Sequence, residues 1–221
     1  MAFSPLPVKA AGDLFDLAAY NICKDDFDAS APGVVAVKGD LVAAIAVNAI
    51  ARLAVGPDNA ILVADSGEAT GLAWQIVPAA RVYNDAGIAI GAASWTTLTF
   101  NQERYDPEGC HSTVANTGRL TVPAGGAGIY HIDGMVEVDM PGAAGDSLSG
   151  LRIRLDGATV IGRDEALRPR DEDVSFSVGC DYELAVGQYV ELQYYSGGGY
   201  DILQSDNYSP VFSWHWIRRP S

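Results

Sequence analysis

Hydrophobic and polar positions alternate most regularly in the stretch GAGIYHIDGMVEVDM, residues 126–140. Successive side chains of a β-strand face opposite sides, so this alternation divides the stretch into two faces. One face is apolar and holds Tyr130, Ile132, Gly134, Val136, Val138 and Met140. The other face gathers a histidine and three carboxylates around one methionine: His131, Asp133, Met135, Glu137 and Asp139. The pattern predicts a strand with one face in a core and one polar face.

Short apolar runs of the same kind fill the chain from residue 95 to its end. The Asp156-Gly157 pair supplies the positive-φ turn of a hairpin between LRIRL and ATVIG. About eight short strands without an intervening helix predict an antiparallel jelly-roll sandwich, which is an all-β fold. Large apolar residues are expected in its core or at an interface between copies, namely Phe100, Tyr130, Leu155, Val190, Phe212, Trp214 and Trp216.

The first 94 residues have a different pattern. Within AGDLFDLAAYNICKDDF, apolar residues recur at helical spacing, which predicts a helix near residues 13–27. Short apolar runs separated by turn residues follow, and they predict small strands without a large core of their own. All three lysines lie in this part, and the rest of the chain uses only arginine. We therefore expect a small N-terminal module over residues 1–94 and a jelly-roll domain over residues 95–221.

The charge balance excludes two classes of partner. Fourteen basic against 28 acidic residues give a net charge of −14, and such a protein repels phosphate backbones and anionic membrane surfaces. The longest apolar stretch, LVAAIAVNAIARLAV, is interrupted by Asn48 and Arg52 and is too short to span a bilayer. The segment MAFSPLPVKAAGDLF lacks the charged start and apolar run of a secretory signal. We expect no nucleic-acid partner, no membrane insertion, and synthesis in the cytoplasm without a signal peptide.

The residues that carry chemistry do not form a known catalytic pattern. The histidines are His111, His131 and His215, and no GxSxG, HExxH or CxxC motif accompanies them. Two-residue spacing separates the polar side chains of the 131–139 row by roughly 7 Å, too far for all of them to share one metal ion. A pair of them with a cross-strand partner could bind calcium, and a face that meets water or a neighbouring subunit is the alternative. We predict no catalytic, cofactor or metal site.

Two further features are open to more than one interpretation. Cys110 and Cys180 could form a disulfide, although small buried thiols are expected where three cysteines lack CxxC spacing. The segment RDEALRPRDED, residues 163–173, is expected to be a solvated, ion-paired loop, because it lacks the EF-hand pattern of a calcium loop.

The segment YYSGGGYDIL is a candidate contact loop. Its three tyrosines, Tyr194, Tyr195 and Tyr200, flank three consecutive glycines. Tyrosines on a loop suit contact with a sugar or a protein, because each offers area and a hydroxyl at low entropy cost. A glycine hairpin with tyrosines in the core is the other interpretation.

Five pieces of the second part resemble, in the same order, the complement globular-head and tumour-necrosis-factor-like jelly roll. They are TLTFNQERYD, GRLTVPAGGAGIYHIDGMVEV, LRIRLDGATVI, LAVGQYVELQYYSGGGYDI and FSWHWIRR. Gly128 and Tyr130 match the Gly-x-Tyr core strand of that family. The Leu-x-x-Gly-x-x-Val-x-Leu strand is matched by Leu184, Gly187, Val190 and Leu192. The resemblance covers roughly residues 95–219 and implies a homotrimer.

The resemblance is closer to the bacteriophage variety of this domain than to the complement type. The segment ARLAVGPDNAILVADSGEATGLAWQIVP also resembles a linker of phage fibre and tail proteins. This resemblance implies a non-enzymatic virion structural protein on the exterior of the particle, such as a capsid decoration, head fibre or tail spike knob. Residues 1–94 would attach it to capsid or tail proteins, and the jelly roll could contact a host surface glycan or protein. A bacterial trimeric adhesin or lectin-like module is the alternative. A polysaccharide-degrading enzyme is less favoured, because the chain has no β-helical repeat.

Overall fold

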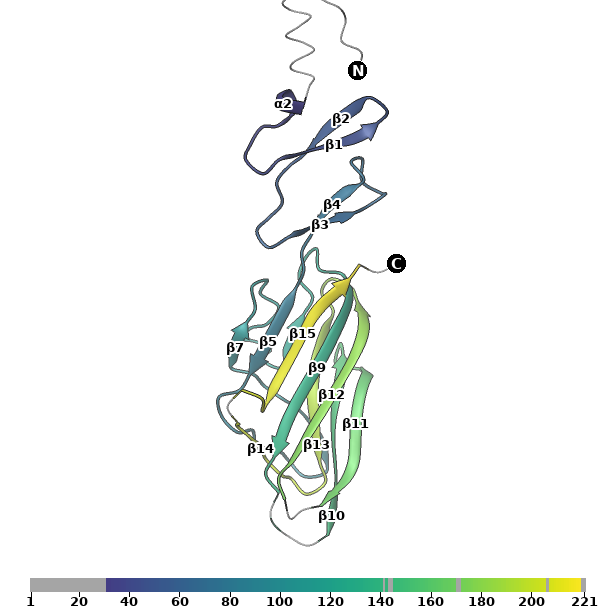
Figure 1. Cartoon of the computed structure of the whole chain (residues 1–221). Coiled ribbons are helices and arrows are strands. Elements are labelled where there is room, and N and C mark those ends of the chain that lie inside the picture. Colours follow the sequence, from purple (N-terminus) through teal and green to yellow (C-terminus); the bar gives the residue numbers. More distant parts are fainter. Residues whose placement is uncertain (1–30, 141, 143–144, 170–171, 206, 220–221) are drawn as a thin grey trace, which may run out of the picture. The chain divides into compact units, whose positions relative to one another are not determined.

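The computed structural model describes residues 31–140, 142, 145–169, 172–205 and 207–219 (Figure 1). The chain divides into two compact units, Met1–Gln75 and Ile76–Ser221. The structure thus places the division earlier than the predicted one at residues 94 and 95, because strand β5 (Ala79–Tyr83) pairs with the last strand of the sandwich. The helix predicted near residues 13–27 lies outside the described residues.

The first unit is built from two antiparallel hairpins. After the short helix α2 (Ala31–Val34), β1 (Leu41–Ala46) pairs with β2 (Ala49–Leu53), and β3 (Ile61–Ala64) pairs with β4 (Leu72–Gln75). In the described part of this unit, Ala43 is the one buried hydrophobic residue. The hairpins therefore lack a substantial core of their own, as the short apolar runs predicted.

Two side chains hold the chain between these hairpins. The indole Nε1 of Trp74 donates a hydrogen bond to the Ala54 carbonyl at 2.7 Å. A Cβ on Gly56 would lie only 2.4 Å from the Trp74 ring, so glycine permits this close approach. The carboxylate of Asp40 accepts a hydrogen bond from the backbone N–H of Val55 at 3.2 Å, and others from those of Ala36 and Val37 at 2.8 and 2.9 Å.

The second unit is a sandwich of two antiparallel sheets. Sheet 1 has the order β12-β9-β15-β5-β7, and β14 pairs with β9. Sheet 2 has the order β11-β10-β13-β8, and β6 (Ser94–Thr97) runs beside β13. The remaining strands are β7 (Gln102–Tyr105), β8 (Arg119–Thr121), β9 (Gly128–Val138), β10 (Asp146–Leu155), β11 (Thr159–Pro169), β12 (Val174–Leu184), β13 (Tyr189–Ser196), β14 (Ile202–Leu203) and β15 (Val211–Arg218).

The path of the chain between the sheets gives the jelly roll. It passes from β8 in sheet 2 to β9 in sheet 1, returns for the β10–β11 hairpin, and then visits β12, β13 and β15 in alternate sheets. Chain-adjacent strands that lie in opposite sheets are typical of this double-sheet architecture. The predicted all-β jelly-roll sandwich is confirmed.

The core lies between the two sheets and is rich in aromatic side chains. Burial alternates along β9, with its even-numbered residues from Gly128 to Val138 buried and its odd-numbered residues half-buried. The ring of Tyr130 lies 4.6 Å from that of Trp214, and Phe100 lies 5.9 Å from Phe212. All seven residues expected in the core or at an interface are buried: Phe100, Tyr130, Leu155, Val190, Phe212, Trp214 and Trp216.

Gly128 has a physical reason to be glycine. A Cβ at this position would lie 2.0 Å from Nε1 of Trp216 and 2.6 Å from the carbonyl oxygen of Arg218. Such distances are far below van der Waals contact, so a larger residue would displace Trp216 from the core. The Gly-x-Tyr sequence thus combines a close approach of β15 with a buried ring two residues later.

Candidate interaction surfaces

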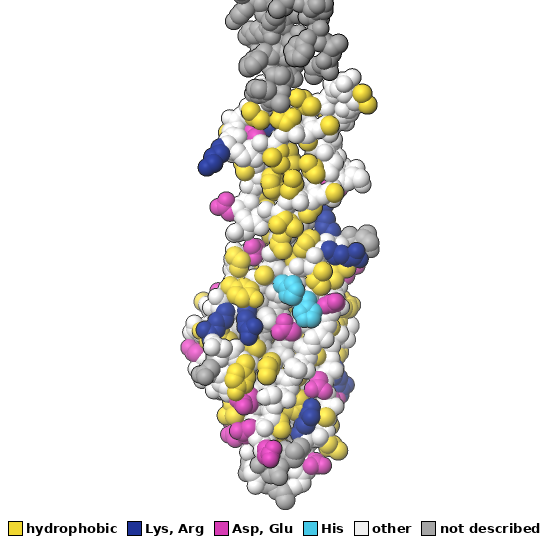
Figure 2. Space-filling view, in the orientation of Figure 1, with side chains coloured by type: hydrophobic (Ala, Val, Ile, Leu, Met, Phe, Trp, Pro, Cys, Tyr) yellow, Lys and Arg dark blue, Asp and Glu magenta, His cyan; other side chains and the backbone are white. Residues whose placement is uncertain are grey.

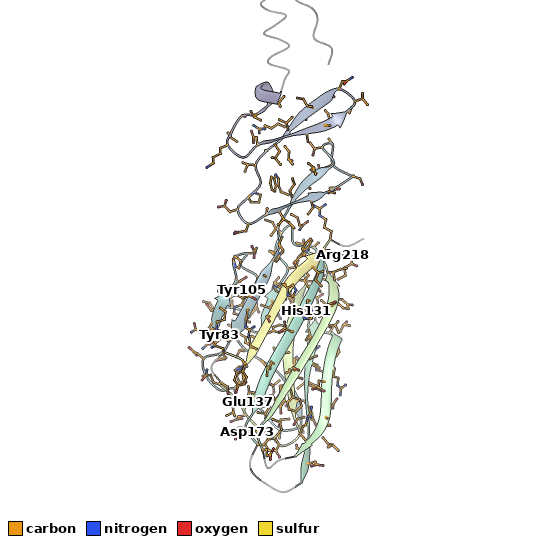
Figure 3. The ribbon with its side chains drawn as sticks, in the orientation of Figure 1. Tyr83, Tyr105, His131, Glu137, Asp173 and Arg218 are labelled. Atoms are coloured by element: carbon orange, nitrogen blue, oxygen red, sulfur yellow. The ribbon has the colours of Figure 1, made fainter. Side chains whose placement is uncertain are left out.

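The outer face of sheet 1 carries a pair of histidines. His131 on β9 and His215 on β15 are direct partners in the strand register, and their ring centroids are 5.3 Å apart. On the other side of β9, Asp181 of β12 lies opposite His131, and its Oδ1 is 2.7 Å from Nδ1 of His131. Figure 2 shows two histidine side chains next to each other on this face, and Figure 3 labels His131. We call His131, Asp181 and His215 the histidine cluster.

The three carboxylates of the predicted polar row lie apart, and two of them are hydrogen-bonded to hydroxyl groups. Asp133 accepts a hydrogen bond from the hydroxyl of Ser213 at 2.9 Å. Glu137 accepts hydrogen bonds from the hydroxyls of Tyr208, at 3.1 Å, and Ser205. Asp139 is exposed beyond the end of β9. Among the described residues, no three His, Cys, Asp or Glu side chains are arranged to hold a metal ion. The row is therefore a line of separate hydrogen-bonded groups.

Apolar side chains also lie on the outer face of sheet 1. Tyr105 of β7 and Ile217 of β15 are 48% and 44% exposed. Met135 lies half-buried on the same face of β9 as His131. At the side of the face, the guanidinium of Arg104 lies 4.2 Å from the ring centroid of Tyr83 (Figure 3 labels Tyr83 and Tyr105). The outer face of sheet 1 thus mixes apolar and polar groups, as the surfaces of protein interfaces do.

The outer face of sheet 2 carries an arginine–tryptophan cluster, made of Trp95, Arg152, Arg163 and Tyr195. The guanidiniums of Arg152 and Arg163 lie 4.0 and 5.5 Å from the ring centroid of Trp95. The ring of Tyr195 lies 5.5 Å from that of Trp95. Burial lowers the pKa of Arg152, and the neighbouring charges of Arg154 and Arg163 lower it further. This concentration of positive charge stands out in a protein with a net charge of −14.

Only some of the tyrosines of the predicted contact loop lie at the surface. Tyr194 is fully buried, and its ring packs 5.7 Å from that of Phe176, so its predicted contact role is wrong. Strand β13 continues to Ser196, and alternation therefore sends Tyr194 into the core and Tyr195 to the outer face. Tyr200 is half-buried and packs over Gly198, where a Cβ would lie 2.1 Å from its ring.

The charged segment predicted as a loop begins inside a strand. Residues 163–169 belong to β11, which pairs with β10 along its whole length. Arg163 forms an ion pair with Glu165, and Arg168 lies 3.7 Å from Asp164. The expected ion pairing is present in this part, but on an edge strand.

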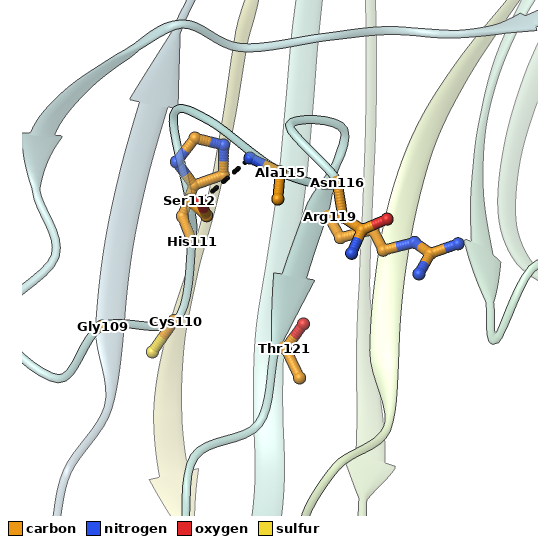
Figure 4. Close-up of a pocket in the computed structure, with 8 residues that line it drawn as sticks. All are labelled: Gly109, Cys110, His111, Ser112, Ala115, Asn116, Arg119 and Thr121. Carbon is orange, nitrogen blue, oxygen red and sulfur yellow. Dashed lines mark hydrogen bonds between the residues drawn. The ribbon is translucent and has the colours of Figure 1, made fainter.

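A hollow of about 270 Å³ lies beside β8, lined by the 109–112 turn, by Ala115 and Asn116, and by Arg119 and Thr121 (Figure 4). The ring of His111 is bound on both sides, since Nδ1 lies 2.9 Å from Glu103 and Nε2 lies 3.1 Å from the Thr117 carbonyl. Burial strongly raises the pKa of the Cys110 thiol, which keeps it protonated and unreactive at neutral pH. Arg119 is engaged with Glu191 at 3.2 Å. These lining groups have structural partners and do not form an activated nucleophile.

Cys110 and Cys180 are both free thiols, so the disulfide that the sequence left open is absent from the structure. Cys110 is buried and Cys180 is half-buried, as the interpretation of small buried thiols expects. In the described part of the chain, no helix is long and apolar enough to cross a membrane.

Comparisons with known proteins give distant likenesses among solved structures. No protein-family model matches the chain, and no curated protein matches it. Among solved structures, the chain is similar to the globular domain of the zebrafish complement 1qA protein, with 17% sequence identity and a TM-score of 0.47. That match covers 65% of this chain and 99% of the zebrafish domain.

Proposed function

We propose that this protein is a non-enzymatic structural protein of a bacteriophage virion, a trimeric jelly-roll knob held on the capsid or tail by its first unit. The observation that carries the proposal is the apolar surface of that unit. Among the described residues of the first unit, one hydrophobic side chain is buried, and nine large ones are exposed: Val35, Val37, Leu41, Val42, Ile45, Val47, Val55, Ile61 and Leu62. Isolated hairpins are marginally stable in water, and exposed apolar surface of this kind marks an interaction site.

The second unit supports the same proposal as the projecting part. Domains of the complement and tumour-necrosis-factor type often form trimers, and the sequence resemblance to the phage variety gives the virion context. Both ring nitrogens of His111 have hydrogen-bond partners, and the thiol of Cys110 is protonated, which favours a non-catalytic role.

Attachment is tested with matched valine substitutions. Val47, at the tip of the first hairpin, is 92% exposed, and Val114 in the second unit is 90% exposed. Val47→Asp together with Ile45→Asp should prevent incorporation of the protein into particles when phage lacking the native copy is complemented. Val114→Asp should leave incorporation unchanged. Normal incorporation of the first variant would contradict attachment through this hairpin.

Trimer formation is tested separately by the mass of the purified full chain in native buffer. The proposal expects three times the 23.3 kDa mass of one chain. A monomer at every concentration would contradict the trimer and leave attachment to be judged from the incorporation experiment.

A lectin-like binding module is the second candidate function, and the arginine–tryptophan cluster favours it. Arginine recognises carboxylates in a bidentate way, and aromatic rings offer a rigid contact surface. A glycan array should then reveal binding to acidic sugars. Arg152→Gln should abolish this binding, and Arg81→Gln, a control substitution on sheet 1, should preserve it. Absence of any bound acidic glycan would contradict this candidate.

A further inference from the structure

We propose that His131 and His215 bind a divalent transition-metal ion on the outer face of sheet 1, and that Asp181 positions His131 for it. The proposal does not depend on the virion assignment. It uses the cross-strand partner that the sequence alone left unidentified, since strand register sets His215 directly beside His131. Imidazole nitrogens are typical ligands of zinc, copper and nickel, which distinguishes this pair from an oxygen-rich calcium site.

The separation of the two rings fits a shared metal ion. Two imidazoles on one tetrahedral Zn²⁺, at about 2.0–2.1 Å, place their ring centroids about 5.2 Å apart, because each centroid lies about 1.1 Å beyond its nitrogen and the N–Zn–N angle is about 109°. The observed separation of the ring centroids of His131 and His215 is 5.3 Å. The backbone register therefore holds the two ring centroids at the separation that a shared metal ion requires.

Asp181 prepares His131 as a ligand. Its carboxylate accepts a hydrogen bond from Nδ1–H of His131 at 2.7 Å, which leaves the lone pair on Nε2 for the metal ion. A carboxylate behind a metal-binding histidine orients the ring and raises its basicity. For His215, no protein hydrogen bond to either ring nitrogen is found within the described part of the chain.

The site is open to an ion from solution. The side chains of His131 and Asp181 are 43% and 63% exposed, and His215 is exposed. Because no third protein ligand joins the pair among the described residues, water completes the coordination shell. The affinity is therefore weaker than that of a structural zinc site with four protein ligands.

Calorimetric titration of the untagged, chelator-treated full chain with Zn²⁺ tests the proposal. We expect saturable binding of one ion per chain. His131→Ala and His215→Ala should each lower the affinity at least tenfold, and Asp181→Asn should lower it about tenfold or more. Glu183→Gln is the matched control, because it removes an equal charge from the same strand two residues away and should change the affinity less than twofold.

Two further readouts separate metal binding from a merely structural role. In nuclear magnetic resonance spectra, Zn²⁺ should shift the Nε2 resonance of His131 while circular dichroism stays unchanged, and untagged protein should be retained on an immobilised nickel column. The absence of saturable binding would overturn the proposal. Binding that survives both histidine substitutions, or a stoichiometry of one ion per three chains, would also overturn it.

Discussion

Tyr130 is the residue whose substitution tests the assignment of the two faces of β9. Its side chain is fully buried, its ring packs 4.6 Å from that of Trp214, and its hydroxyl donates a hydrogen bond to the Gly126 carbonyl at 2.5 Å. Tyr130→Ala removes the ring and leaves a cavity, and for buried aromatics this costs about 3–5 kcal/mol of unfolding free energy. Tyr130→Phe keeps the ring and leaves only the carbonyl unpaired, which costs about 1–3 kcal/mol.

Urea unfolding followed by tryptophan fluorescence measures these losses, because Trp214 reports directly on the site. Tyr182→Ala is the matched control, since Tyr182 is the cross-strand partner of Tyr130 on β12 but is 36% exposed. Its loss should stay near 1 kcal/mol or below, as is usual for a partly exposed cross-strand pair. A Tyr130→Ala loss below about 1 kcal/mol, or equal losses for the two alanine variants, would refute the core assignment.

Three other predictions concern close packing, thiol reactivity and acid sensitivity. Gly128→Ala should lower the free energy of unfolding in urea by about 1–3 kcal/mol, because the added methyl group clashes with Trp216. Gly91→Ala is the control, since its Cβ would meet only ordinary contacts and should cause no such loss. Equal stability of the two variants would contradict the packing of β15 on Gly128. Burial raises the pKa of both Cys110 and Cys180. Thiol labelling of the native protein, measured for each cysteine by mass spectrometry of its peptide, should therefore be slow at both and fast only in denaturant. Rapid labelling of Cys110 in the native protein would contradict its burial. Hydrogen bonds from the backbone N–H groups of Val37 and Ala36 lower the pKa of Asp40 below 3.8. The stability that this carboxylate contributes is therefore present at neutral pH and is lost as the pH falls below 3.8 through the folded-state value. The protection of the Val37 amide against hydrogen exchange, taken relative to the intrinsic exchange rate at each pH, should fall there, and Asp40→Asn should remove that pH dependence.

Local pattern predicted much of the sandwich. Alternation along residues 128–138 gave the correct buried face, because a strand with one covered face must place apolar side chains at every second position. The turn at Asp156-Gly157 was also readable, since both residues have positive φ in the structure. The jelly roll follows from many such short strands.

Other features depend on contacts between distant segments and could not be read from local pattern. Strand β5 was assigned to the first module because its sequence neighbours lie there, but its partner is β15 at the other end of the chain. Tyr194 was misjudged because the glycines that follow it concealed the continuation of β13 to Ser196. In both cases the strand pairing decides the outcome.

The candidate surfaces also depend on contacts between strands that are distant in the sequence. Alternation along β15 puts His215 on the face opposite Trp214 and Trp216, but only the register of β15 on β9 brings it beside His131. The arginine–tryptophan cluster joins Trp95 of β6 with Arg152 of β10 and Tyr195 of β13. No spacing along the chain relates these three residues, so the cluster could not be predicted.

Electron cryo-microscopy of intact particles can show whether a trimeric knob stands on the exterior of a virion. We expect density for three jelly rolls around a common axis on the outer surface, with the first unit against the capsid or tail. Particles that contain no such density, or that carry the jelly roll as a single copy, would contradict it.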